Sequence, residues 1–221
     1  MLFKEIRLQT NHVSALYYFY KEVLELATVY SNEKSFTVTV GETNLIFEET
    51  HDIENPLYHF AFNIPVNKFD EAFQWLKNKV ELLWLDDYKS LIADFINWHA
   101  KSIYFNDPGG NILELITRFD LNDNVNEKFS SKHLRNVSEI GLVYATQNFD
   151  EKVEELLAQY PLSYFHKQPP LPHFRAVGND EGLFVIVPEN RVWFSTKNTI
   201  SQIFPLKINF HVDDKPYQLI I

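Results

Sequence analysis

Apolar and polar residues alternate in three short stretches of the chain, at residues 3–9, 58–64 and 137–143. Alternation with a period of two predicts β-strands that bury one face. After each stretch, apolar residues recur at intervals of three and four, which predicts an amphipathic helix with one buried face. In the second copy these apolar positions are Phe69, Ala72, Phe73 and Leu76.

Further alternating strands follow each predicted helix, so that the pattern repeats as strand, helix and then more strands. These later strands lie at residues 35–40 and 44–49, 102–105 and 112–117, and 174–177 and 183–187. A fourth opening strand follows at residues 206–212, close to the end of the sequence. The repeated unit is therefore βαβββ, present three times with the start of a fourth.

A turn signal stands between the last two strands of the second unit. The segment Asp107-Pro-Gly-Gly-Asn111 combines a proline, which presets one backbone dihedral, with residues that accept a positive φ. This composition predicts a hairpin that leads into the strand carrying Glu114.

Residues 120–135 are polar and rich in Asn, Asp, Lys and Ser, which predicts a linker. It separates a complete pair of units, residues 1–119, from an incomplete pair, residues 136–221. A single βαβββ sheet would expose one apolar face, so we expect the units to pair and enclose a cavity. The expected fold class is α+β, with paired βαβββ modules that form a curved mixed sheet around a cavity and an incomplete second pair.

Composition narrows the chemistry. The chain has no cysteine, which excludes disulfides, thiolate ligands and cysteine nucleophiles and leaves His, Asp and Glu as metal ligands. Its formal net charge of -10 argues against nucleic-acid partners and against an anionic membrane surface. No stretch approaches the roughly 18 apolar residues that a membrane span needs. We therefore expect a cytoplasmic protein.

Two motifs carry a family resemblance. His59-Phe-Ala-Phe-Asn-Ile64 opens the second unit, and Asp107-Pro-Gly-Gly-Asn-Ile-Leu-Glu-Leu115 closes it. Together they resemble the vicinal oxygen chelate superfamily, which includes glyoxalases, bleomycin-resistance proteins and extradiol dioxygenases. The resemblance is close over residues 1–119 and loose over 136–212.

The resemblance implies one divalent metal ion in the N-terminal half. In this superfamily the first strand of a unit can carry a ligand and the last strand carries a Glu, which match His59 and Glu114. Glu5 stands at the equivalent position of the first unit and completes a set of three ligands. Nitrogen and oxygen donors suit Mn, Fe, Ni, Co or Zn. A salt bridge from Glu5 to Arg7 is the alternative reading of Glu5.

The alternation places other polar residues on the faces of these ligands. Arg7 shares a strand face with Glu5, and Asn63 shares one with His59. Together with Tyr104, we expect Arg7 and Asn63 to contact the substrate.

The C-terminal half lacks an equivalent set. Glu139 and Lys207 hold the first-strand positions, and residues 185–187 are purely apolar where a Glu would be needed. A lysine cannot coordinate beside a cation. We therefore expect this half to be structural.

Residues 86–101 form an insertion in the second unit, where a short connection would suffice. Long insertions in compact domains are usually functional or disordered, and this one has too many aromatic residues for disorder. We expect Trp98 to stack on a flat substrate at the cavity mouth and His99 to move a proton. The alternative is that Trp98 only fills the core beneath the loop.

These observations predict a metal-dependent enzyme of glyoxalase type, a lyase or isomerase or a dioxygenase, acting on a small oxygenated organic molecule. Besides metal binding, Glu114 would have a catalytic role. The alternative is a metal-free protein that sequesters a ligand, as bleomycin-binding relatives do. The expected partner is a small molecule, and a homodimer remains open.

Overall fold

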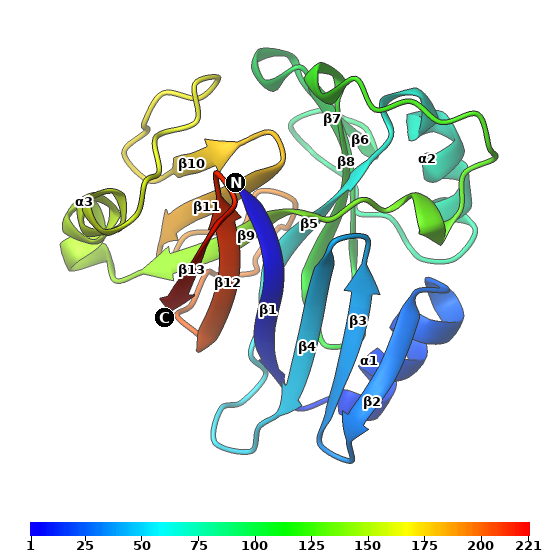
Figure 1. Cartoon of the computed structure of the whole chain (residues 1–221), viewed down its shortest axis with the longest axis horizontal. Coiled ribbons are helices and arrows are strands. Elements are labelled where there is room, and N and C mark those ends of the chain that lie inside the picture. The colour runs from blue at the N-terminus through cyan, green and yellow to red at the C-terminus, as the bar shows by residue number, and fades with distance from the viewer.

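The computed structural model describes all residues from 1 to 221 and contains two mixed β-sheets (Figure 1). The six-stranded sheet has the order β13 (Lys215–Ile220), β12 (Leu206–Val212), β1 (Leu2–Thr10), β4 (Thr43–Glu49), β3 (Ser35–Val40) and β2 (Ala27–Asn32). The seven-stranded sheet has the order β10 (Arg175–Asn179), β11 (Gly182–Pro188), β9 (Val137–Tyr144), β5 (His59–Ile64), β8 (Ile112–Arg118), β7 (Ala100–Asn106) and β6 (Ile92–Phe95).

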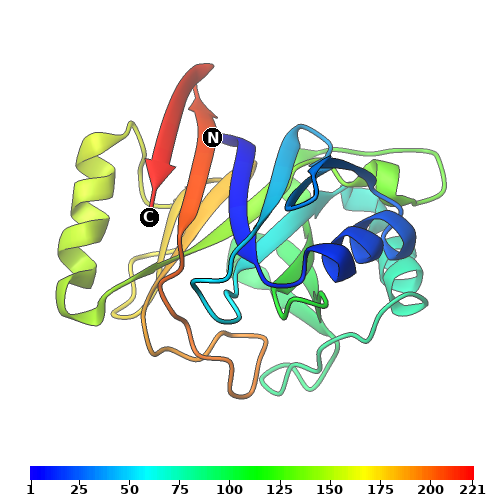
Figure 2. The same cartoon turned by 90° about the horizontal axis from the view of Figure 1, so that it is seen from below.

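Three α-helices lie outside the sheets: α1 (Val13–Tyr18), α2 (Phe69–Lys77) and α3 (Phe149–Gln159). Figure 2 shows α3 at one end of the molecule and α1 and α2 at the other, with strands between them. None of the helices is both long and apolar enough to span a lipid bilayer. The expected α+β class is confirmed, and the first two units are βαβββ. The third unit differs from the expectation, because only two strands, β10 and β11, follow its helix. The fourth has β12 and β13 alone.

The units pair differently from the expectation that the first would join the second. Strand β5 of the second unit pairs with β9 of the third, whereas β1 pairs with β12, and both pairs are antiparallel. The physical reason is that all four opening strands share the same alternation, so the periodicity does not select a partner. Residues on both sides of segment 120–135 therefore contribute to both sheets.

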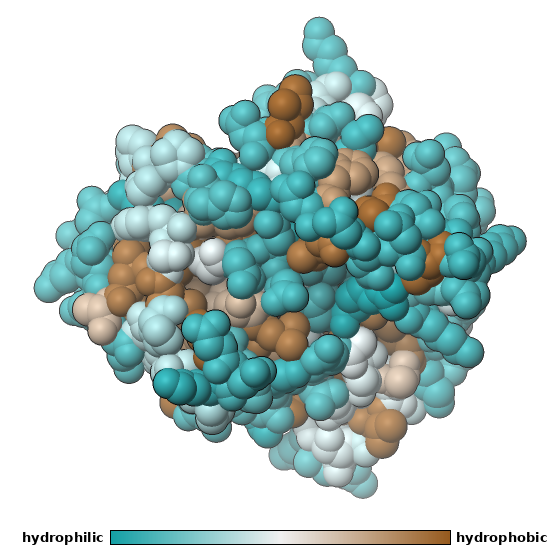
Figure 3. Space-filling model, turned by 45° about the horizontal axis from the view of Figure 1, so that its top comes forward, coloured by the Kyte–Doolittle hydropathy of each residue, from teal (hydrophilic) through white to brown (hydrophobic).

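The two sheets pack against each other through apolar inner faces. The ring of Phe3 on β1 lies 5.3 Å from that of Phe184 on β11, and Phe184 lies 5.4 Å from Phe210 on β12. These residues belong to a continuous core of 44 buried side chains drawn from both sheets and all three α-helices. On the outside, the face shown in Figure 3 is mostly hydrophilic, with apolar side chains in small separate groups.

Burial distinguishes the outer faces of the two sheets. Every residue of β5 is buried, whereas Glu5, Arg7 and Gln9 on β1 are only partly buried. The outer face of β5 is covered because long connections fold over the seven-stranded sheet. This covered face is where a ligand can be enclosed.

The turn at residues 107–111 forms the predicted hairpin and fixes the strands beside it. The carboxylate of Asp107 is buried and accepts hydrogen bonds from the backbone N–H groups of Gly109 and Asn111, at 2.9 and 3.0 Å. It also accepts one from the Tyr20 hydroxyl at 2.8 Å. Asn111 in turn accepts from the backbone N–H of Tyr58 at 2.9 Å, which ties the turn to the start of β5.

We expect Asp107→Ala to lower the free energy of unfolding by about 3 kcal/mol, because it leaves several buried donors without an acceptor. Urea denaturation measures the change. Glu42→Ala is the control, since Glu42 forms an exposed ion pair with Lys4 that contributes at most about 1 kcal/mol. Equal effects of the two substitutions would contradict the expected contribution of the Asp107 hydrogen bonds to stability.

Candidate metal centre and active site

Three neighbouring strands bring one potential ligand each to the covered face of the seven-stranded sheet. His59 comes from β5, Glu114 from β8 and Glu139 from β9, and all three side chains are buried. The pairing explains their convergence, because Ala61 of β5 lies opposite Glu114 on one side and Glu139 on the other. One donor atom from each residue lies within 4.8 Å of the other two.

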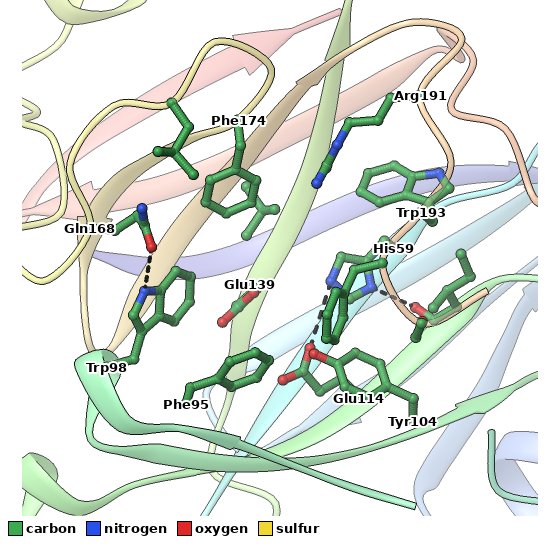
Figure 4. A pocket seen from close by; sticks show the side chains of 15 residues that line it. His59, Phe95, Trp98, Tyr104, Glu114, Glu139, Gln168, Phe174, Arg191 and Trp193 are labelled. Carbon is green, nitrogen blue, oxygen red and sulfur yellow. Dashed lines mark hydrogen bonds and ion pairs between the residues drawn. The ribbon is translucent and has the colours of Figure 1, made fainter. Parts of the chain in front are cut away.

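His59 is set up as a neutral ligand. Its Nδ1 lies 3.1 Å from the backbone carbonyl oxygen of Ile112. A carbonyl only accepts, so Nδ1 carries the proton and Nε2 keeps its lone pair. Burial lowers the pKa of His59 to about 4, so the ring is uncharged at neutral pH. Nε2 lies 3.7 Å from Oε2 of Glu114 (Figure 4).

The two carboxylates crowd negative charge into a buried place. Burial, and then the negative charge of Glu139, raise the pKa of Glu114 to about 8. Burial also raises the pKa of Glu139. The Oε1 atom of Glu114 is buried without a hydrogen-bond partner, which is costly unless something cationic or a donor satisfies it.

These features fit a divalent cation. The set offers one imidazole nitrogen and carboxylate oxygens from two residues, donors that suit first-row divalent metals. A cation would neutralise the crowded carboxylates and satisfy the orphaned oxygen of Glu114. The residues therefore fit the metal that the resemblance implied, with Glu139 as the third member.

A buried arginine lies beside the three ligands. Arg118, the last residue of β8, has an exposed side-chain fraction of 0% and forms an ion pair with Glu139. Its Nε donates to the Ser138 hydroxyl at 3.1 Å, and its Nη1 lies 3.6 Å from Asp180. Lys167 donates to both carboxylate oxygens of Asp180 at 2.8 Å. This network orients Glu139, whereas the only ion pair of Glu114 is the one with His59.

A cavity of about 340 Å³ opens over the three ligands. Its walls come from the insertion before β7 and from the connections before β10 and after β11 (Figure 4). Trp98 donates its indole N–H to Gln168 at 3.0 Å, which joins two of these segments. The aromatic side chains that line the cavity are Phe95, Trp98, Tyr104, Phe174, Trp193 and Phe194. The site can therefore enclose a small, flat, largely apolar molecule against the ligands.

The chain is similar in sequence to known proteins over part of its length. It is 32% identical over 105 residues to a metallothiol transferase FosB of Staphylococcus epidermidis, a match that covers 45% of this chain and 69% of the relative. It is also 32% identical over 105 residues to the enzyme of the same name from Staphylococcus saprophyticus, covering 65% of that relative. These transferases are members of the superfamily that the two motifs resembled.

The chain belongs to the vicinal oxygen chelate superfamily. A scan against protein-family models finds no match. A solved structure from Bacillus subtilis subsp. subtilis str. 168, provisionally described as a dioxygenase, matches the fold with a TM-score of 0.60 at 12% identity. That match covers 100% of this chain and 84% of the other. It therefore supports the fold of the whole chain, including the third and fourth units.

The structure brings together some of the residues expected from the sequence. His59 and Glu114 lie side by side, and Trp98 and Tyr104 line the cavity above them. Trp98 also packs its ring 5.2 Å from that of Phe165, so it closes the core as well as the cavity.

Glu5 and Arg7 lie elsewhere, in the six-stranded sheet. Arg7 donates to Glu5 at 2.9 Å and to Glu48 at 2.8 Å, and Asn209 donates to Glu5 at 3.2 Å. The alternative reading of Glu5 as an ion-pair partner of Arg7 describes its contacts. The reason for the separation is the pairing of β5 with β9 rather than β1.

Asn63 and His99 do not line the cavity either. Asn63 donates to Asn136 at 3.2 Å, toward the end of β5 that lies away from His59. The His99 side chain is 62% exposed, and its Nδ1 lies 2.8 Å from Asp120. The backbone at His99 is left-handed, with φ of 50°, and its ring lies 5.1 Å from that of Phe119.

Three residues at the site are not among those expected from the sequence: Glu139, Arg118 and Arg191. Glu139 lies in the half that we expect to be structural, but its first-strand position, equivalent to that of His59, is a signal for a ligand. Arg118 had a signal too, since it ends a strand whose preceding residues are mostly apolar. Arg191 lies in an irregular connection and carries no periodic signal.

The raised pKa of Glu114 has a consequence for stability. The folded, metal-free protein holds a proton on Glu114 up to about pH 8, whereas the unfolded chain releases it near the ordinary value of 4.5. The folded state binds more protons in this interval, so its stability falls as the pH rises toward 8. We expect the melting temperature of chelator-treated protein to fall between about pH 6 and about pH 8.

Glu114→Gln is the control, because glutamine has nearly the same shape and cannot ionise. It should make this part of the pH profile less steep in differential scanning calorimetry, with the remaining slope due to groups such as Glu139. A melting temperature of the chelated wild type that rises over the same interval would contradict the assignment.

Proposed function

We propose that this protein is a metal-dependent enzyme that acts on a small oxygenated organic molecule. The observation that carries the proposal is the convergence of His59, Glu114 and Glu139, with an orphaned carboxylate oxygen, beneath an aromatic cavity. A binding pocket with a few converging polar groups is the usual form of an active site.

The three residues would hold one divalent cation through Nε2 of His59 and the carboxylates of Glu114 and Glu139. When bound, a cation of this kind supplies Lewis acidity to two neighbouring oxygens of a substrate. Mn, Fe, Ni, Co and Zn all accept such donors. The ion pair with Arg118 would orient Glu139, as partners behind metal ligands commonly do.

The donor set bears on the reaction class. Non-haem iron oxygenases commonly use two His and one carboxylate, whereas this set has one His and two carboxylates. It therefore favours a lyase or isomerase reaction over a dioxygenase reaction. The FosB relatives are named as metallothiol transferases, so thiol transfer is a further candidate reaction beside lyase and isomerase reactions. Because the chain has no cysteine, any thiol would have to be a second substrate.

The side chains around the set would bind and orient the substrate. Burial and the negative charge of Glu114 raise the pKa of Tyr104 well above its ordinary value, so its hydroxyl keeps its proton. It can therefore donate a hydrogen bond to a substrate oxygen. Phe95 and Trp98 would pack against a flat ring and exclude water, which strengthens polar interactions in the cavity. Glu114 would accept a proton at its carboxylate during turnover.

Metal content tests the proposal. Protein purified without chelator, or reconstituted with Mn, Fe, Ni, Co or Zn in turn, should hold about one divalent cation per chain, since one set of ligands is present. Elemental analysis of the dialysed protein measures the ratio. Absence of bound metal with all five cations would overturn the enzyme proposal.

The alternative is a metal-free protein that sequesters a small molecule. One observation favours it: Arg118 already neutralises Glu139, and the raised pKa of Glu114 lets that residue remain uncharged without a metal. Ligand binding that is unchanged by chelator would support this alternative. A homodimer and a cytoplasmic location remain predictions, and size-exclusion chromatography with light scattering tests the first.

A further inference from the structure

Arg191 differs from every other arginine of the chain. Arg7, Arg118, Arg135 and Arg175 each form an ion pair with a carboxylate. The half-buried side chain of Arg191 has neither an ion pair nor a hydrogen bond, yet it lines the cavity. Figure 4 shows its guanidinium reaching toward the middle of the cavity, above Glu139 and His59. A guanidinium has five N–H donors, and all of these lack a protein acceptor here.

The backbone holds Arg191 in this position. Its N–H donates to the Ser201 hydroxyl at 3.0 Å, and its carbonyl accepts from the N–H of Ser201 at 2.7 Å. Ser201 is itself buried and donates its hydroxyl proton to the carbonyl of Pro188 at 2.7 Å. The guanidinium lies 5.6 Å from the centre of the Phe174 ring. The cation is therefore anchored at both its backbone and its side chain.

An anchored, partly desolvated cation without a counter-ion is unfavourable in the protein alone. Burial lowers the pKa of Arg191 from its ordinary value, but a guanidinium still remains charged at neutral pH. The aromatic rings around the guanidinium offer only the weak negative potential of their faces and no full negative charge. The molecule that fills the cavity can supply the missing acceptor in place of water.

We propose that Arg191 binds an anionic oxyacid group of the ligand, such as a carboxylate, sulfonate or phosphonate. The preferred ligand is then a flat, largely apolar molecule with one acidic group at Arg191. Its opposite end would face His59, Glu114 and Glu139, a part of the inference that rests on the proposed function. Planar, paired N–H donors recognise such oxyanions through two parallel hydrogen bonds.

Two probes of the same shape separate charge from apolar contact: benzenesulfonate, an anion that coordinates metals weakly, and methyl phenyl sulfone, which is neutral. We expect wild-type protein to bind the sulfonate at least about tenfold more tightly than the sulfone, because hydrogen bonds to charged groups are the strong ones. Arg191→Gln should remove this preference, and Arg191→Lys should retain part of it. Quenching of tryptophan fluorescence measures both constants, since Trp98 and Trp193 line the cavity.

Lys197→Gln is the matched control. Lys197 belongs to an outer surface hollow that shares Phe194 and Ser195 with the cavity, but it does not line the cavity itself. This variant should keep the preference, which excludes general attraction by nearby positive charge. Equal binding of the two probes by the wild type, or a preference that survives in Arg191→Gln, overturns the inference. Failure of both probes to bind up to about 10 mM also contradicts it.

The two proposals fail separately. Each probe is titrated into the protein as purified, and the metal content of the same sample is measured. Protein that binds none of the five cations on reconstitution and still prefers the sulfonate would overturn the enzyme proposal and support the role of Arg191. Metal-loaded protein without the preference would overturn the role of Arg191 alone.

Discussion

Replacing Glu139 by glutamine should weaken metal binding about a hundredfold or more, whereas Glu5→Gln should leave it unchanged. Loss of an outer partner of a metal ligand alone commonly lowers affinity by about 10- to 100-fold, so loss of a charged ligand should do at least as much. Glu139 has a donor oxygen within 4.8 Å of those of His59 and Glu114. Glu5 is instead engaged with Arg7 and Asn209 in the other sheet.

Competition with a chromophoric chelator measures these affinities for the variants and the wild type. His59→Ala and Glu114→Gln should behave as Glu139→Gln does, because all three supply one donor to the same point. Glu139→Gln and Glu5→Gln each remove one negative charge, so a difference between their metal affinities does not come from net charge. A Glu5 variant that loses metal while the Glu139 variant keeps it would restore the ligand set expected from the sequence.

The elements of the fold could be predicted from the sequence because each carries its own periodicity. The strand at His59–Ile64, the helix at Phe69–Lys77 and the hairpin at Asp107 all follow from local patterns. The pairing of the units could not be predicted in this way. Strands β1, β5, β9 and β12 have similar alternation, and only the packing of the whole chain decides which of them meet.

The same distinction explains the candidate site. His59 and Glu114 belong to one unit, on adjacent strands β5 and β8, so a motif within that unit identifies both. Glu139 reaches them only because β9 pairs with β5 across the unit boundary. The long aromatic insertion indicates Trp98, whereas Arg191 lies in a connection between two later units. The positions of Glu139 and Arg191 in the site therefore depend on contacts between units, which local sequence patterns do not reveal.

Arg118 shows how strongly the site and the fold depend on each other. Its side chain is fully buried between Glu139 and Asp180, under the rings of Trp98 and Phe165. A buried cation of this kind is unfavourable by itself, and so are the carboxylates around it. Each is tolerated because the others are present. Removing one member therefore destabilises more than its own contacts would suggest.

Arg118→Ala should lower the free energy of unfolding by about 3–5 kcal/mol, because it leaves Glu139 buried without its cation. Arg118→Lys should recover only part of this loss, since an ammonium cannot reproduce the contacts to Ser138 and Asp180 together.

Arg135→Ala is the matched control: its pair with Asp123 is about one-third exposed, and its removal should change the free energy of unfolding by at most about 1 kcal/mol. Urea denaturation of chelator-treated protein measures all three, and a loss below about 1 kcal/mol for Arg118→Ala would show that Glu139 is stabilised by other means. Because a divalent cation would also neutralise Glu139, metal should narrow the difference in stability between Arg118→Ala and the wild type, whereas it should stabilise Arg135→Ala and the wild type equally.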